Sequence, residues 1–176
     1  MKKPTHNTKK FGAKIQEYKD KEQSDIEASE LVKNELQQAN TILGNTDVEG
    51  EGIVVTLRET NTEETGVINA NDLLDIVNEL KNAGAEAISI NGQRIVANSV
   101  IDCDGSVIRV NGVKIGAPFE IKAIGLQETL VMVDRYGGYL WSMREEWLLE
   151  AELKRADNIT IPKYSGVIKF EYAESE

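Results

Sequence analysis

The stretch EAISINGQRIVANSVIDCDGSVIRVNGVKI (residues 86–115) decides the fold, because three turn signals divide it into short β-rich segments. Asn91-Gly92, Asp104-Gly105 and Asn111-Gly112 are dipeptides that favour two-residue hairpin turns. Between them, apolar and polar residues alternate, which is the pattern of strands with one buried face. We therefore predict a meander of antiparallel strands that is buried on one side and wet on the other.

The same turns predict which residues of the meander lie opposite one another. The expected pairs are Ile90–Gln93 and Ile88–Ile95, then Cys103–Ser106 and Ile101–Ile108, then Val110–Val113 and Ile108–Ile115. In this register the buried face carries Ile101, Cys103, Ile108, Val110, Val113 and Ile115. The wet face carries Asp102, Arg109 and Lys114.

A strand and a helix are predicted before the meander. Residues 52–57 form a short segment rich in β-branched residues, as in a strand with two covered faces. After a polar loop at 59–69, Asn71 is the expected cap of a helix that Gly84 ends. The predicted apolar face of this helix consists of Leu73, Leu74, Val77, Leu80 and Ala83.

The segments after the meander complete an α+β pattern. We expect a strand at 120–124, a helix at 126–136, a short helix at 139–144, closing strands at 147–153 and 158–161, and an edge segment at 167–172. The order of these elements matches a ferredoxin-like split βαβ layout with extra β-hairpins. The predicted fold class is therefore α+β, preceded by a long helical stalk.

The stalk is predicted from residues 14–43, which contain neither Gly nor Pro and are rich in helix formers. Val32, Leu36, Ala39 and Leu43 follow a 4-3-4 spacing, but polar residues interrupt this seam further back. Gly44 and Asn45 are the expected end of the helix. We predict a disordered basic tail at 1–13, a helical or coiled-coil stalk at 14–45 and a globular domain at 50–173, with weak self-association through Val32, Leu36 and Leu43.

Charge is distributed unevenly along this chain of 176 residues, whose formal net charge is −10. Residues 1–22 hold seven Lys against three acidic residues, which leaves −14 for the rest. An acidic body disfavours nucleic acid, because nucleic-acid affinity rests largely on Lys and Arg. The basic start suits either an anionic membrane surface or a solvated tail, and the sequence leaves both open.

Catalytic chemistry has little support in the sequence. The single His is His6, in the predicted tail, so His-based triads and His-based metal sites are not expected. The single Cys, Cys103, excludes an internal disulfide and is expected to be a buried, inert thiol. A carboxylate pair for glycoside hydrolysis stays open among the 30 acidic residues. We predict no enzyme, no cofactor and no metal.

One polar cluster is a candidate binding site, namely Asn91, Gln93, Arg94, Asn98 and Ser99. A guanidinium beside a tight turn suits a carboxylate or phosphate group of a ligand or partner. The alternative interpretation is hairpin chemistry with one surface Arg. In the functional interpretation Arg94 is solvent-exposed, whereas in the alternative it is buried in a salt bridge to the helix that precedes the meander.

Several segments resemble the YlxW/YlxX-like family, once labelled division initiation proteins. They are GIVVTL (52–57), DLLDIVNEL (72–80), AGAEAISINGQR (83–94), Asn111-Gly112, APF (117–119) and IKAIG (121–125). The resemblance covers about residues 36–165. It implies an N-terminal transmembrane helix, a coiled coil and an extracytoplasmic domain of unknown biochemical function, linked loosely to cell division or sporulation. The sequence contains no such apolar helix, so the resemblance implies that its basic start lies next to the membrane.

Two functions of different classes follow. The first is a non-catalytic interaction or structural module of a membrane-anchored bacterial envelope protein, which binds another envelope protein and forms a homodimer. The second is a sensor domain that binds a small anionic ligand at residues 91–94. The acidic body and the helical stalk favour the first function.

Overall fold

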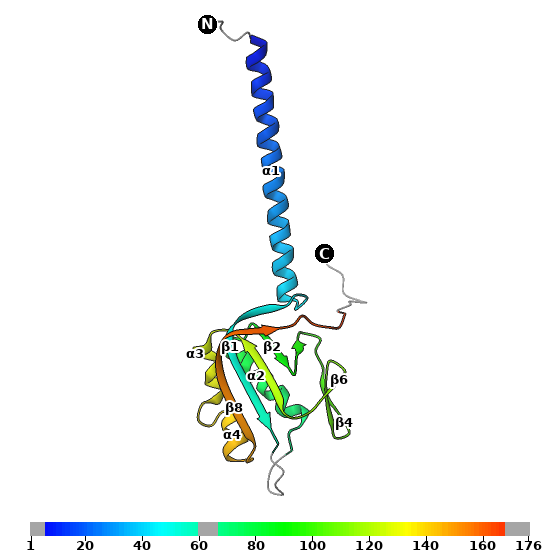
Figure 1. Cartoon of the computed structure of the whole chain (residues 1–176), viewed down its shortest axis with the longest axis vertical. Helices are drawn as coiled ribbons and strands as arrows, with labels where there is room; N and C mark the ends of the chain where they lie inside the picture. Colours follow the sequence, from blue (N-terminus) through cyan, green and yellow to red (C-terminus); the bar gives the residue numbers. More distant parts are fainter. Residues whose placement is uncertain (1–5, 60–66, 168–176) are drawn as a thin grey trace. The chain divides into compact units, whose positions relative to one another are not determined.

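The computed structural model describes residues 6–59 and 67–167 (Figure 1). Internal contacts group the chain into two compact units, residues 1–42 and 43–176. Helix α1 (His6–Ile42) makes up the first unit. It begins at His6, so residues 6–13 are helical and the predicted disordered tail is wrong for them. Within the described ranges, no helix combines the length and apolar character needed to cross a membrane.

A five-stranded antiparallel sheet organises the second unit. Its order is β3-β2-β7-β1-β8, formed by β1 (Val48–Arg58), β2 (Ala87–Ile90), β3 (Gln93–Ile95), β7 (Phe119–Ile124) and β8 (Glu150–Ile161). The helices are α2 (Ala70–Asn82) between β1 and β2, and α3 (Gln127–Leu130), the 3-10 helix η1 (Val131–Asp134) and α4 (Tyr139–Glu145) between β7 and β8. Without the added edge strand β3, this order is that of a split βαβ fold, which confirms the predicted α+β class.

The boundaries after β7 differ from the prediction. The expected helix at 126–136 is divided between α3 and η1, and the two expected closing strands form the single strand β8. Of the expected edge segment at 167–172, only Val167 lies within the described residues, and it is not in a strand.

The predicted meander of residues 86–115 is divided: its first hairpin, β2–β3, belongs to the five-stranded sheet, and a separate three-stranded sheet contains β4 (Ile101–Asp104), β5 (Val107–Val110) and β6 (Val113–Ile115). The predicted registers around Asn91-Gly92 and Asn111-Gly112 are confirmed. The register around Asp104 is wrong by two residues, because Ile101 pairs with Val110. In the observed register Arg109 lies opposite Asp102, and its Nη2 donates to Oδ2 of that residue over 2.9 Å.

A two-residue shift keeps every side chain on its predicted face, because side chains alternate along a strand. Ile108 and Val110 are buried in the core as expected. Val113 is exposed, so its predicted burial is wrong. Cys103 is also exposed, and its predicted burial is wrong as well. It sits near the turn end of β4, where neighbouring Asp104 is also exposed and the core no longer covers the strand.

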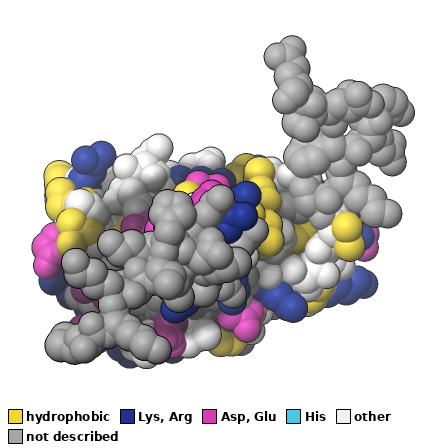
Figure 2. All heavy atoms as spheres, turned by 90° about the horizontal axis from the view of Figure 1, so that it is seen from above, with side chains coloured by type: hydrophobic (Ala, Val, Ile, Leu, Met, Phe, Trp, Pro, Cys, Tyr) yellow, Lys and Arg dark blue, Asp and Glu magenta, His cyan; other side chains and the backbone are white. Residues whose placement is uncertain are grey.

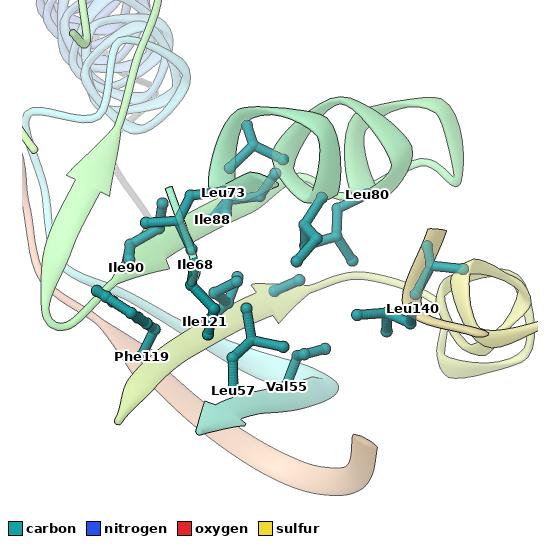
Figure 3. Packing of buried hydrophobic residues seen from close by; sticks show 14 of the residues in the cluster. Val55, Leu57, Ile68, Leu73, Leu80, Ile88, Ile90, Phe119, Ile121 and Leu140 are labelled. Atoms are coloured by element: carbon teal, nitrogen blue, oxygen red, sulfur yellow. The ribbon is translucent and has the colours of Figure 1, made fainter. Parts of the chain in front are cut away.

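The main core lies between the sheet and α2 (Figure 3). In that view Leu73 and Leu80 point from α2 toward the strands that carry Val55 and Ile121. Leu74, predicted on the same face, is exposed, and Ile76 is buried instead. The helix starts earlier than expected, because the cap is Asn69, whose side chain accepts from Asn71 N and Asp72 N while Asp72 accepts from Asn69 N.

A smaller apolar cluster forms on the opposite face of the sheet. It contains Ala87, Ile124, Ile159 and Ile161, with Val48, Val54 and Ala156 packed against them. A β-bulge between Gly50 and Gly52 shifts the register of β1 against β8. The shift explains why Leu153, before the bulge, packs on the main core while Ile159, after it, joins the second cluster.

Gly52 allows β1 to approach β7 closely. A Cβ atom placed on it would lie 1.9 Å from the carbonyl oxygen of Ala123 and 3.0 Å from the Cα of Ile124. These are backbone atoms of a paired strand, so they cannot move aside as a flexible side chain can. Position 52 therefore requires glycine for a steric reason.

We expect Gly52→Ala to destabilise the domain by roughly 1 to 3 kcal/mol, the scale of overpacking in a core. Urea unfolding measures the change. Gly116→Ala is the matched control, because nothing lies within 4 Å of its added Cβ. Equal stability of the two variants would show that the β1–β7 contact is not tight.

Candidate interaction surface

The predicted polar cluster around residues 91–99 is mostly used to hold the fold together. Asn91 Nδ2 donates to the carbonyl oxygens of Gly116 and Pro118, and its Oδ1 accepts from the backbone N–H of Glu120 over 2.7 Å. These bonds tie the β2–β3 turn to the start of β7. Asn91 is thus engaged within the domain and not directed at a partner.

The other small polar residues of the cluster divide into two groups. Ser99 Oγ accepts from Val96 N over 2.8 Å and donates to the carbonyl oxygen of Arg94, so Ser99 shapes the loop after β3. Asn98 is exposed and Gln93 is half-buried. The cluster therefore does not form one surface.

Arg94 differs from both outcomes set out for it. Only 4% of it is exposed, which contradicts the expected solvent-accessible position. Among the described residues it makes no salt bridge, and its Nη1 atom is buried without a hydrogen-bond partner. Burial lowers the pKa of the guanidinium. A role of this cluster in binding stays a prediction.

The predicted oligomerisation residues are accessible. Val32 and Leu36 are exposed on α1, and Leu43, also exposed, lies one residue after the end of the helix. Exposed apolar side chains on a helix are compatible with self-association. Self-association through these three residues stays a prediction.

A surface that the sequence analysis did not identify is built around α4. Both tryptophans of the chain and two of its five tyrosines fall within residues 136–147. The rings of Tyr136 and Trp141 have centroids 4.7 Å apart, and those of Tyr139 and Trp147 are 5.4 Å apart in an edge-to-face arrangement. We call Tyr136, Tyr139, Trp141, Trp147 and Leu148 the aromatic surface.

The aromatic surface is accessible to a partner. Tyr136 is 86% exposed and Trp147 is 37% exposed, and Leu148 beside it is also exposed. A hollow of about 240 Å³ borders Trp147 and is lined further by Val67, Asn69 and Asp72. On the face shown in Figure 2, hydrophobic side chains lie scattered among basic and acidic ones, as on most protein surfaces. Paired aromatic rings are a more specific sign of an interaction surface than such scattered hydrophobic side chains.

Hydrogen bonds and an ion pair hold α4 in place. The Tyr139 hydroxyl donates to Asp72 Oδ1 over 2.8 Å and so links α4 to the first turn of α2. Arg144 pairs with Asp134 and donates from Nη1 to the carbonyl oxygen of Ala151 in β8. The aromatic surface is thereby attached to helix α2, to η1 and to the sheet.

The backbone at Leu148 has φ +53°, a left-handed conformation that is uncommon for a bulky residue. The conformation falls between exposed Trp147 and buried Leu149. Leu148 lies in the short link between the end of α4 and the start of β8 at Glu150. Such conformations gather at functional positions more than elsewhere.

The density of aromatic residues in 136–147, a range that includes Gly137-Gly138, is the signal that could have identified this surface from sequence. Only the fold shows that the rings are exposed, because aromatic side chains are as common in cores as on interfaces.

Burial, together with the hydrogen bond to Asp72 and the nearby charges of Asp72 and Asp75, raises the pKa of Tyr139 above its usual value. The folded protein therefore keeps this proton at a pH where the unfolded chain, with a tyrosine pKa of about 10, loses it. The contribution of Tyr139 to stability is present below about pH 10 and is lost as pH rises further.

We expect Tyr139→Phe to lower the free energy of unfolding by about 1.5 kcal/mol at pH 8, because a hydrogen bond to a charged acceptor is lost. We also expect the variant to lose less stability than the wild type between pH 8 and pH 11. Urea unfolding at both pH values measures the two effects. An identical pH dependence in both proteins would contradict the assigned hydrogen bond.

A family model and two curated relatives place this chain among similar bacterial proteins. A family model described as a bacterial protein of unknown function (DUF881) matches residues 35–174. UPF0749 protein YlxW of Bacillus subtilis (strain 168) is 34% identical over 106 residues, which are 57% of this chain and 46% of that protein. UPF0749 protein YlxX of the same organism is 39% identical over 84 residues, 45% of this chain and 36% of that protein. The matches thus span less than half the length of either relative.

A solved structure shows the same fold. The crystal structure of an uncharacterized conserved protein from Mycobacterium tuberculosis has a TM-score of 0.66 and 22% identity, with 81% of this chain and 99% of that chain covered. At this identity the likeness concerns the fold alone. The family match over residues 35–174 confirms the resemblance drawn from the sequence motifs, and the chain belongs to the DUF881 family of bacterial proteins of unknown function.

Proposed function

We propose that this protein is a non-catalytic interaction module whose globular domain binds a partner protein through the aromatic surface. The observation that carries the proposal is that each of two aromatic pairs at α4 has one exposed ring, Tyr136 in the first and Trp147 in the second. Tyr and Trp are enriched among residues that dominate binding energy, because they bury a large area with few rotatable bonds. Tyr136 and Trp147 flank α4, so an anchored α4 would hold both ends of this segment and lower the cost of ordering the exposed rings on binding.

The proposal extends to the cell envelope. The resemblance to YlxW/YlxX-like proteins supports a membrane-anchored protein on the extracytoplasmic face, with a partner in the envelope and a link to cell division. The seven Lys residues of positions 1–22 suit the anionic head groups next to such an anchor. In this arrangement the exposed apolar residues of α1 bring copies together.

A second candidate function is a sensor for a small anionic ligand. It is favoured by two buried atoms without hydrogen-bond partners, Ser89 Oγ and Arg94 Nη1. Their residues are directly opposite each other on β2 and β3. Buried polar groups without partners are rare, and an anion would satisfy both. The low exposure of both residues makes this function the weaker of the two.

The first prediction here concerns the aromatic surface. Tyr136→Ser with Trp147→Ser should reduce the partner recovered with the membrane-anchored protein at least tenfold, because truncated hot-spot residues cost 2 kcal/mol or more. The pulldown is made from membranes of the host organism. Val100→Ser with Val113→Ser, which alters two exposed apolar residues elsewhere, is the control. Equal recovery with both double variants would contradict the proposal.

The second prediction concerns self-association of the stalk. Replacing Val32, Leu36 and Leu43 with Ser should leave the domain folded and shift sedimentation toward the monomer, because the seam loses its apolar side chains. Replacing exposed Ile26, Leu31 and Ile42, which lie off the 4-3-4 spacing, should leave the oligomer unchanged. An oligomer that survives in the seam variant would show that the seam is not the interface.

A further inference from the structure

A second feature beside the aromatic surface is a groove between two helical segments. It has a volume of about 460 Å³ and runs between the last turns of α2 and the α3–η1 segment. Glu79 and Ala83 line the α2 wall, and Glu128, Met132 and Val133 line the other. The groove is large enough for a side chain of a partner.

The charge of the groove favours a cation. Glu79 and Glu128 face it from opposite walls, and within the described residues neither makes an ion pair. The C-terminal end of α2 adds the negative end of a helix dipole, since α2 ends at Asn82 with Ala83 as its cap. Arg135 is the single cation among the lining residues. The net charge of the lining residues is therefore negative, because two glutamates outnumber one arginine.

Apolar side chains complete the groove. Among its lining residues, Val133 is buried, Ala83 is half-buried and Met132 is exposed. Methionine adapts its shape to different contacts. Long cationic side chains combine an aliphatic stem with a charged head, and the groove offers a surface for each part. A small metal ion would use only the carboxylates, whereas a Lys or Arg side chain would use both.

The groove and the aromatic surface are continuous along the chain. Met132 and Val133 lie in η1, Arg135 follows and also lines the groove, and Tyr136 next to it contacts Trp141 in a tilted ring pair. A partner that covers Tyr136 would therefore have its neighbouring residues beside the groove. The negative charge of the groove favours a basic residue at the partner position that lies beside it.

We propose that the groove receives a Lys or Arg side chain of the partner protein that docks on the aromatic surface, an inference that rests on the proposed function. Two carboxylates bind the cationic head from opposite sides while Met132 and Val133 contact the stem. The partner is thus a protein segment with a basic residue next to an apolar one.

Methionine methyl signals provide a direct test in the full chain, because the sequence contains only Met1, Met132 and Met143. Met143 is fully buried and serves as an internal reference, whereas Met132 lines the groove. The probe is the blocked peptide acetyl-Gly-Leu-Lys-Leu-Gly-amide, and the matched peptide has norleucine in place of lysine. We expect a saturable shift of the Met132 methyl with the lysine peptide alone.

Two charge-matched variants locate the binding. Glu79→Gln with Glu128→Gln should weaken the lysine peptide at least fivefold, while Glu145→Gln with Glu146→Gln, exposed and outside the groove, should change it less than twofold. Thermal unfolding checks that both remain folded. An unmoved Met132 signal, equal binding of the norleucine peptide, or equal weakening by both variants would overturn the inference.

The outcome separates this inference from the proposed function. If Met132 does not respond but the Tyr136 and Trp147 variant still loses its partner, the groove inference alone fails. If Met132 responds and that variant keeps its partner, the aromatic surface is not the docking site and the groove acts by itself.

Discussion

The close approach of β1 to β7 at Gly52 is the constraint on which the rest of the domain depends. β1 is paired on both sides, with β7 and with β8, so its path sets the shape of the sheet. The absence of a side chain at Gly52 lets the carbonyl of Ala123 occupy the space that a Cβ would need. The adjacent bulge then redirects β8, and each half of that strand packs on a different face of the sheet.

The position of the aromatic surface follows from how helices cover the main-core face of the five-stranded sheet. α2 and α4 both pack on the main core, Leu73 from one and Leu140 from the other (Figure 3). Leu140 and Met143 are the fully buried residues of α4, and Tyr139 packs against the same core, whereas the exposed Tyr136 and Trp147 lie just beyond the two ends of the helix. The link from Tyr139 to Asp72 fixes α4 against α2. Binding residues on a rigid support can engage a partner without reordering.

Local signals predicted much of the fold. The Asn-Gly pairs gave two of three hairpin registers, and Asn91 and Asn111 indeed have the left-handed backbone such turns require, with φ +46° and +54°. Gly84 follows the end of α2 as expected, and its backbone is left-handed, with φ +89°. These features depend on neighbours in the chain, which is why a sequence can reveal them.

Features set by distant residues were not predicted. The turn between β4 and β5 is Gly105-Ser106 and not the predicted Asp104-Gly105, and this register places Arg109 opposite Asp102. Burial of Arg94 depends on segments far from it, including Gly44, whose added Cβ would lie 3.7 Å from Arg94 Nε. The helix cap was misplaced by two residues, since Asn69 and Asn71 both suit that position.

The aromatic surface escaped detection for a related reason, because exposure is a property of the whole fold and not of the segment. Its role in binding a partner is the central claim. The most direct measurement is photo-crosslinking in living cells, with a benzophenone side chain placed at Tyr136 and, in a separate strain, at Val113 on β6. The account predicts a discrete protein adduct from position 136 and none from position 113. Adducts of equal yield from both positions, or none from position 136, would contradict it.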